Sequence, residues 1–132
     1  MQQIVPFLMF EGCAEEAITF YTTTFKNSEV LNITRYGEHA AGTEGSVQQA
    51  SFVLNGQKFM CIDSNVKHAF SFTPSFSLYV RCTSDAEIEE LFSKLAEGGK
   101  VLMPLSHYFF SKKYAWVADK FGVAWQLNLH AD

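Results

Sequence analysis

The alternation of apolar and polar residues predicts one set of elements in the first half of the chain. Residues 4–10 form an apolar run with the length of a buried strand, and residues 14–25 change to helical spacing. Pro6 lies within the apolar run, so we expect this strand at a sheet edge or near its own start. Three more strands are predicted at residues 29–35, 46–54 and 58–63. Asn55-Gly56 joins the last two as a tight hairpin, and residues 37–45 form a glycine-rich loop.

The second half repeats this order with different residues. A strand is predicted at residues 75–82. Ser84 and Glu87 then form a capping box, in which a hydroxyl and a carboxylate accept free backbone N–H groups at a helix start. The helix has a buried stripe at Ile88, Leu91, Phe92, Leu95 and Ala96. It ends at Gly98-Gly99, as the first helix ends at Asn27, because both residue types accept the left-handed conformation of a helix cap. The final strands are predicted at residues 101–105, 114–118 and 123–129, with a turn at 119–122 before the last.

The two halves align with each other, and this repeat predicts the fold. The helix segment 17–21 corresponds to segment 88–92, and Gly56-Gln57-Lys58-Phe59 corresponds to Gly122-Val123-Ala124-Trp125. Two unrelated amphipathic helices would not also share their caps and the glycines before their final strands. We therefore predict a single α+β domain spanning residues 1–132, built from one βαβββ unit used twice. The two copies are expected at about residues 1–66 and 72–132.

Composition and charge exclude several classes of function. The 132 residues are 48% hydrophobic and 15% aromatic, which is enough apolar surface for a packed core. The net charge is −4, and Lys112-Lys113 is the only adjacent basic pair, so the basic patch that nucleic-acid binding needs is missing. No apolar run approaches the ~18 residues of a spanning helix, and the N-terminus lacks the basic start of a signal peptide. We expect no nucleic-acid partner and no membrane association.

The cysteines, the histidines and two aspartates have structural interpretations. Cys13, Cys61 and Cys82 are odd in number and show no CxxC spacing, which argues against a disulfide framework or a zinc site. We expect them to be small buried residues in a reducing, cytoplasmic location. The histidines are expected in loops or at the C-terminus, exposed to solvent: His39, His68, His107 and His130. Asp63 and Asp119 are expected to make local hydrogen bonds.

Four motifs carry a family resemblance. They are Pro6-Phe7-Leu8-Met9-Phe10 leading into Ala14-Glu15-Glu16-Ala17-Ile18-Thr19-Phe20-Tyr21, then Phe72-Thr73-Pro74 before the fifth predicted strand, Gly99-Lys100-Val101-Leu102-Met103-Pro104-Leu105, and Asp119-Lys120-Phe121-Gly122-Val123-Ala124-Trp125-Gln126. With these motifs the chain resembles the vicinal oxygen chelate superfamily of glyoxalase I, bleomycin-resistance and extradiol-dioxygenase-like proteins. It is most similar to the PhnB-like branch, whose members often carry the name 3-demethylubiquinone-9 3-methyltransferase. The resemblance implies the glyoxalase/bleomycin resistance/dioxygenase fold, with curled mixed sheets forming a cup, helices outside, and a homodimer.

The resemblance also implies where a metal would bind. Enzymes of the superfamily hold a divalent ion on inward-facing residues of four strands, two from each half. Neighbouring side chains on a strand point to opposite faces. Leu8 and Phe10 are expected to face the first helix and Leu78 and Val80 the second, while Phe59 and Trp125 also pack under the helices. The alternate residues then fill the four positions: Val5, Met60, Ser75 and Gln126. Valine has no donor atom, a thioether and a neutral hydroxyl are weak ligands for such ions, and one amide oxygen does not hold a metal. We predict no metal and no cofactor.

The same alternation predicts the side chains that line the cup. They are Val5, Phe7, Met9, Met60, Ser75, Ser77, Tyr79, Gln126 and Asn128. Apolar walls with a few polar groups suit a small organic ligand, and the alternative is that these side chains fill the cup as core. The first hypothesis is therefore a protein that binds or sequesters a small organic molecule. The second is an enzyme of the superfamily, either metal-dependent or using another residue set.

Methyl transfer is the third hypothesis. A typical S-adenosylmethionine enzyme has a doubly wound parallel sheet with a glycine-rich turn after its first strand, where the backbone can approach the cofactor. In this chain, Glu11-Gly12-Cys13 follows the first predicted strand and supplies one glycine only.

Overall fold

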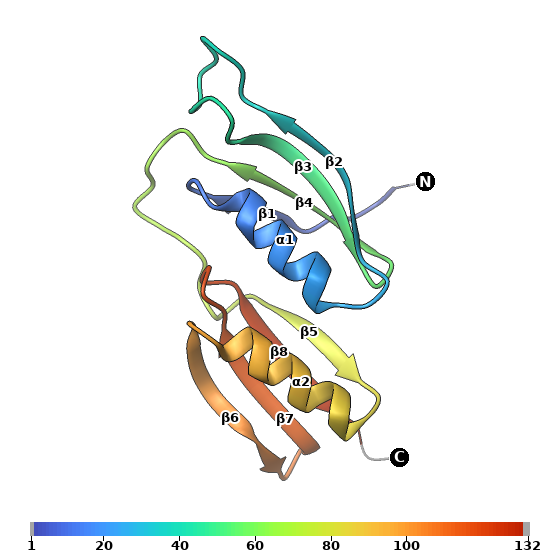
Figure 1. The fold of residues 1–132 in the computed structure, drawn as a ribbon. Coiled ribbons are helices and arrows are strands. Elements are labelled where there is room, and N and C mark those ends of the chain that lie inside the picture. The colour runs from blue at the N-terminus through green and yellow to red at the C-terminus, as the bar shows by residue number, and fades with distance from the viewer. Residues whose placement is uncertain (1, 131–132) are drawn as a thin grey trace. The chain divides into compact units, whose positions relative to one another are not determined.

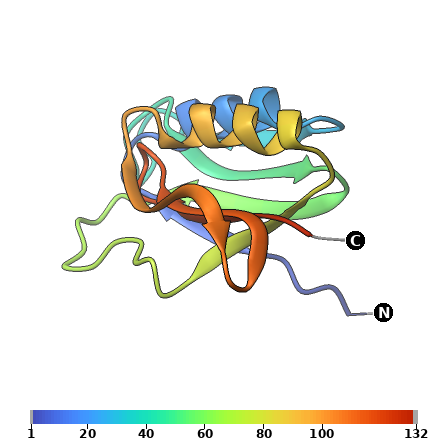
Figure 2. The same ribbon diagram turned by 90° about the horizontal axis from the view of Figure 1, so that it is seen from below.

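The computed structural model describes residues 2–130 and divides into two units, Met1–His68 and Ala69–Asp132. Each unit contains one strand, one helix and then three strands, so the order of elements is the same in both (Figure 1). Each forms its own four-stranded mixed sheet with its helix packed on one face (Figure 2). The α+β class and the two βαβββ modules predicted from the sequence are confirmed.

The first unit has its parallel strand at one edge. Its elements are β1 (Phe7–Phe10), α1 (Ala14–Thr24), β2 (Glu29–Arg35), β3 (Val47–Leu54) and β4 (Gln57–Asp63). The strand order is β1-β4-β3-β2, in which β1 runs parallel to β4 and the other pairs are antiparallel. Asn55 and Gly56 adopt positive φ angles of 48° and 89° between β3 and β4, as the Asn-Gly signal predicts. Pro6 directly precedes the edge strand β1, which agrees with its expected position.

The core of the first unit lies between α1 and the sheet. Leu8 is buried, whereas Phe7, which points to the other face, is 52% exposed. Tyr21 of α1 stacks on Phe52 with ring centroids 6.4 Å apart, and Phe52 stacks on Phe59 with centroids 5.3 Å apart. Phe59 therefore packs toward the helix, as the strand alternation predicts.

A carboxylate at the end of β4 fixes the start of α1. Asp63 is buried, and its Oδ1 accepts hydrogen bonds from the backbone N–H groups of Gly12 and Ala14, each at 2.9 Å. Its Oδ2 accepts the N–H of Val47 at 3.0 Å. The N-cap residue Cys13 has no side-chain oxygen, so Asp63 supplies the negative charge that a helix N-terminus favours. The prediction of local hydrogen bonding is wrong for Asp63, because its partners lie 16 to 51 positions away.

The second unit repeats the topology. Its elements are β5 (Ser77–Cys82), α2 (Asp85–Ala96), β6 (Lys100–Tyr108), β7 (Ser111–Ala118) and β8 (Ala124–Leu129). The strand order is β5-β8-β7-β6, and β5 is parallel to β8. The core is formed by Ile88 and Leu95 of α2 with Val117, Trp125 and Leu127 of the sheet, all buried.

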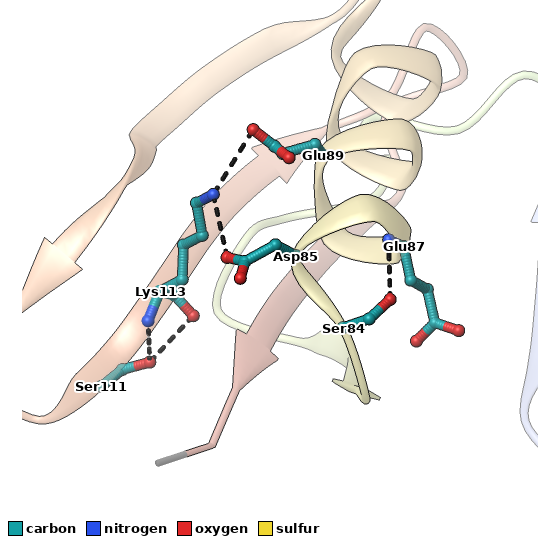
Figure 3. A network of polar contacts seen from close by, with 6 residues as sticks. All are labelled: Ser84, Asp85, Glu87, Glu89, Ser111 and Lys113. Carbon is teal, nitrogen blue, oxygen red and sulfur yellow. Dashed lines mark hydrogen bonds and ion pairs between the residues drawn. The ribbon is translucent and has the colours of Figure 1, made fainter.

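The start of α2 is fixed by its cap and by an ion-pair cluster (Figure 3). Ser84 Oγ accepts the N–H of Glu87 at 3.1 Å, as the predicted capping box requires. The Glu87 carboxylate accepts the backbone N–H of Thr83, one residue before the cap, at 3.0 Å, so the reciprocal bond is shifted by one residue. Lys113 of β7 donates to Asp85 Oδ1 at 3.2 Å and lies 3.4 Å from Glu89 Oε1. The hydrogen bond to Asp85 is the main cause that raises the pKa of Lys113, and both carboxylates contribute their charge.

Several boundaries differ from the prediction. The first strand begins at Phe7, and Ile4 is 91% exposed, because the proline between them cannot donate to β4. In the second unit, β6 and β7 are longer than predicted and form one hairpin, which places His107 within a strand. Pro104 and the register shifts around it obscure the alternation that would have revealed this hairpin. Proline is tolerated there because β6 is an edge strand.

Candidate functional site

Polar and aromatic side chains gather on the face of the second sheet that is turned away from α2, here called the distal face. Lys113 reaches α2, so its neighbour Tyr114 must point to the distal face. Cross-strand pairing extends this face over β5 and β8, because Tyr79 and Trp116 both pair with Gln126. The distal-face positions of these three strands include Ser77, Tyr79, Arg81, Tyr114, Trp116, Gln126 and Asn128.

A chain of three hydrogen-bonded side chains crosses the distal face. Tyr114 Oη donates to Gln126 Oε1 at 2.6 Å, and Gln126 Nε2 donates to Ser77 Oγ at 2.6 Å. Both atoms of the Gln126 amide are thereby fixed by neighbours on β7 and β5. The Ser77 hydroxyl still has its hydrogen to donate, and the Tyr114 oxygen still has lone pairs to accept with. The chain thus holds one further donor and one further acceptor at fixed positions, with the Tyr114 side chain itself buried.

Aromatic rings surround one end of this chain. The Tyr114 ring meets Tyr108 edge-on with centroids 5.8 Å apart and Phe110 with centroids 5.0 Å apart. Burial, followed by the neighbouring Tyr79 and Tyr108, raises the pKa of Tyr114, so its hydroxyl stays protonated and remains a donor to Gln126. Sequence reasoning missed Tyr114, whose place in a polar chain depends on the pairing of β7 with β8.

Trp116 adds an unusual feature to the same face. In the sheet register, Trp116 pairs with Met103 of β6 and with Gln126 of β8. Its Nε1 atom is buried and has no hydrogen-bond partner among residues 2–130. A buried donor without an acceptor costs about 1–3 kcal/mol.

The far end of the distal face carries Arg81. The Arg81 Nε atom donates to His130 Nε2 at 3.1 Å, and the Asn128 amide nitrogen lies 3.2 Å from both ring nitrogens of His130. Asn128 Oδ1 accepts from the hydroxyl of Ser111. Asn128 is buried, whereas Arg81 and His130 are exposed.

The predicted cup residues of the first unit are less polar. Phe7 pairs with Met60 and Met9 pairs with Ile62, so these side chains share the face of the first sheet that is turned away from α1. Val5 precedes β1 and is half-buried. The structure thus brings together the predicted lining residues of each half separately, with the exception of Ser75, and the combined cup stays a prediction.

One predicted residue is misplaced along its strand. Met60 and Gln126 occupy equivalent positions in β4 and β8, and their β1 and β5 partners are Phe7 and Tyr79. The counterpart of Val5 is therefore Ser77 rather than Ser75. Ser75 lies in the exposed turn before β5, where its Oγ is 2.9 Å from Thr73 Oγ1.

The residues at the four superfamily metal positions do not fit a divalent ion. Val5 has no donor atom and Met60 offers a thioether, and the choice between Ser75 and Ser77 supplies only a neutral hydroxyl. The amide oxygen of Gln126 already accepts from Tyr114. Within the described residues, no group of three or more His, Cys, Asp or Glu side chains is arranged to hold a metal. Absence of a catalytic metal stays a prediction.

The remaining candidate residues are dispersed. His39 is exposed in the loop after β2, His107 is exposed on β6, and His68 Nε2 lies 3.0 Å from Ser64 Oγ. Cys61 and Cys82 are buried as expected, whereas Cys13 is only half-buried because it occupies the N-cap of α1.

Burial also makes two of the cysteines poor nucleophiles. Burial and the nearby Asp63 carboxylate raise the pKa of Cys61 to about 12. Burial, then Glu87, raises the pKa of Cys82 to about 11, against a smaller opposing effect of the Asn128 backbone. Both thiols stay protonated at neutral pH, and the thiolate is the nucleophilic form.

The chain has the fold of glyoxalase/bleomycin resistance/dioxygenase domains. A glyoxylase/bleomycin resistance protein/dioxygenase domain from Frankia sp. EAN1pec covers 100% of this chain and 94% of its own, with a TM-score of 0.69 at 14% identity, a likeness of fold alone. The family model for 3-demethylubiquinone-9 3-methyltransferase matches residues 2–128, and the chain belongs to this family. The resemblance that the sequence motifs indicate is confirmed.

Two relatives show how closely the chain follows this family. The structure of a putative 3-demethylubiquinone-9 3-methyltransferase, PhnB protein, from Bacillus cereus is 58% identical. The match covers 97% of this chain and 99% of that one, with a TM-score of 0.95. Protein YjdN of Escherichia coli (strain K12) is 26% identical over 138 residues, covering 94% of this chain and 92% of YjdN.

Proposed function

We propose that the protein binds a small organic molecule on the distal face of its second sheet, without a catalytic metal. The hydrogen-bonded chain Tyr114–Gln126–Ser77 carries this proposal. It fixes a donor and an acceptor on a face that also presents aromatic rings, and binding sites for small organic molecules combine apolar walls with a few such polar groups.

The exposure of this face supports a binding role over a purely structural one. Tyr79 is 52% exposed and Phe110 is 52% exposed, although both are large apolar side chains beside buried polar groups. Side chains that only filled a core would be buried. The exposed rings and the fixed polar chain together suit a ligand with a planar apolar part and hydrogen-bonding substituents.

The topology argues against S-adenosylmethionine-dependent methyl transfer of the usual kind. Such enzymes bind the cofactor at the carboxyl ends of a doubly wound parallel sheet. In this chain each sheet contains a single parallel pair, β1 with β4 and β5 with β8. The turn after β1 is fixed by Asp63, whose carboxylate accepts from the Gly12 N–H and so places negative charge where the cofactor's carboxylate would otherwise bind.

Protein-observed NMR with a panel of small aromatic and aliphatic compounds tests the proposal. Compounds that bind should shift the side-chain amide signals of Gln126 and the ring signals of Tyr79 and Tyr114. The variant Gln126→Met should weaken this binding with little loss of stability, while the control Gln49→Met, an exposed glutamine of β3, should leave it unchanged. The proposal fails if no compound in the panel shifts signals on the distal face.

A further inference from the structure

The ionisable Lys, Arg and His side chains in the strands of the second sheet are not balanced by any acidic side chain in those strands. Its four strands contain no Asp or Glu. They carry several basic residues: Arg81, Lys100, His107, Lys112 and Lys113. This is unexpected in a chain whose net charge is −4, and it means that the acidic residues of this unit lie elsewhere.

The acidic residues of this unit that the structure describes lie away from the distal face. Five of them belong to α2 or follow it directly, on the opposite side of the sheet: Asp85, Glu87, Glu89, Glu90 and Glu97. Asp119 is buried in the turn before β8, where it accepts hydrogen bonds from two backbone N–H groups. On the α2 side, the charge of Lys113 is matched by two carboxylates (Figure 3).

Arg81 forms no comparable ion pair among the residues that the structure describes. No carboxylate in the described part of the chain pairs with it, and its side chain is exposed on the distal face. Its Nε atom is already committed to His130, which restrains the guanidinium group. The two terminal nitrogens keep the parallel N–H groups with which arginine binds a carboxylate in bidentate fashion.

The spacing along β5 suggests the size of a ligand. Ser77, Tyr79 and Arg81 alternate on one face, so about 13 Å separates the first Cα atom from the last. The half-exposed Tyr79 ring lies between the donor hydroxyl of Ser77 and the positive charge of Arg81. A planar group packed on Tyr79 could therefore reach the guanidinium group with an acidic substituent and the Ser77–Gln126–Tyr114 chain with a polar one.

We propose that the ligand of the distal face is an aromatic carboxylate, with Arg81 as its charged anchor. This inference rests on the proposed function and narrows it to one chemical class. Charge complementarity carries it: within residues 2–130 the Arg81 guanidinium group has no carboxylate partner, and the four strands of the sheet contain no Asp or Glu, so the face favours anions over neutral or cationic compounds of the same shape.

A matched pair of probes tests the inference. Naphthalene-2-carboxylate and naphthalene-2-carboxamide have the same ring system and differ in charge, and NMR titration gives the dissociation constant of each. We expect the acid to bind about tenfold more tightly than the amide, the effect of one charge-assisted contact. Arg81→Gln should abolish the difference, and raising the salt concentration should reduce it. Arg35→Gln, at the exposed arginine of the first unit, is the control and should preserve it.

The outcomes separate this inference from the proposed function. If acid and amide bind the distal face equally, or if the preference for the acid survives in Arg81→Gln, the anion inference is overturned while binding to the face stands. If neither probe shifts distal-face signals but other panel compounds do, the aromatic carboxylate class is wrong. If no compound of any class shifts them, the proposed function falls as well. Thermal melts of both arginine variants confirm that they remain folded.

Discussion

The indole nitrogen of Trp125 donates a 2.8 Å hydrogen bond to Oδ2 of Asp119, and both side chains are almost fully buried. The tryptophan fills the space under α2, while the aspartate orders the turn that leads into β8. Replacing Trp125 with Ala should lower the free energy of unfolding by about 3–5 kcal/mol, the usual cost of truncating a buried aromatic residue. Chemical denaturation measures this directly.

Two further variants separate the contribution of packing from that of the hydrogen bond. Trp125→Phe keeps most of the ring but removes the donor to a charged acceptor, and should cost less than the alanine variant. Phe59→Ala removes the corresponding residue of the first unit, which has no hydrogen bond of this kind to lose, and should report packing alone. A loss under about 1 kcal/mol for Trp125→Ala would show that this side chain does not face the core.

Asp63 should be the most sensitive carboxylate of the first unit. Its oxygens accept three backbone N–H groups, from Gly12, Ala14 and Val47. Asp63→Asn should cost about 2–3 kcal/mol, because hydrogen bonds to a charged acceptor are lost or weakened. Hydrogen exchange should accelerate at those three amides. Glu29→Gln, at an exposed position of β2, should change stability by less than about 0.5 kcal/mol, and equal effects of the two variants would contradict this role of Asp63.

The three cysteines should differ in reactivity toward a thiol reagent at neutral pH. Cys13 is half-buried and should react first, whereas Cys61 and Cys82 are buried with pKa values of about 12 and 11 and should react only as the protein unfolds. Mass spectrometry of the labelled protein identifies the modified residue. Cys13→Ser should remove the fast phase, and rapid labelling that persists in this variant would refute the assignment.

The raised pKa values of Cys61 and Cys82 predict that the protein loses stability at high pH. Both pKa values are raised above the ordinary 9.0, so the folded state holds these protons more tightly than the unfolded state does. Their contribution to stability is complete below pH 9 and declines as the pH rises through 11 and 12. Denaturation midpoints should be measured from pH 7 to 11, each relative to the value at pH 7. They should fall less in a double Cys61→Ala, Cys82→Ala variant than in the unchanged protein.

Divalent metals should not stabilise the protein strongly. The four positions at which superfamily enzymes bind their ion offer no adequate donor set here, since the Gln126 oxygen is engaged by Tyr114. Thermal melts with nickel, zinc, manganese or iron should shift little, and elemental analysis of untagged protein should find less than one metal per chain. A stoichiometric metal with a large stabilisation would favour the enzyme hypothesis.

We also propose a homodimer with Pro6 near its edge. The strand that follows Pro6 is the edge strand β1, and edge strands present unpaired backbone groups to a partner. Ile4, 91% exposed beside this edge, gives the proposal a direct test. Light scattering at micromolar concentration should give twice the mass of one chain. Ile4→Glu should shift the population toward monomer, and Val66→Glu, at an exposed loop position, should not. A monomeric mass for the unchanged protein would refute the proposal.

The sequence predicted the elements well where local signals are strong. The helix starts at Ala14 and near Ser84, the Asn55-Gly56 hairpin and the strand Glu29–Arg35 all agree with the structure. Boundaries failed where a proline interrupts the alternation, as in β1 and β6. The candidate site was predicted in part: Ser77, Tyr79, Gln126 and Asn128 share a face, but Tyr114 was missed.

The sequence by itself determined the order of elements, their repetition and the side of each strand that faces a helix, because periodicity, caps and turns depend on neighbouring residues. Only the tertiary structure decided which strands pair and in which register, since a shift along a strand leaves its alternation unchanged. That is why Ser77 replaces Ser75 as the counterpart of Val5. It is also why the chain from Tyr114 through Gln126 to Ser77 emerges only from the folded sheet, since its two hydrogen bonds join residues 12 and 49 positions apart.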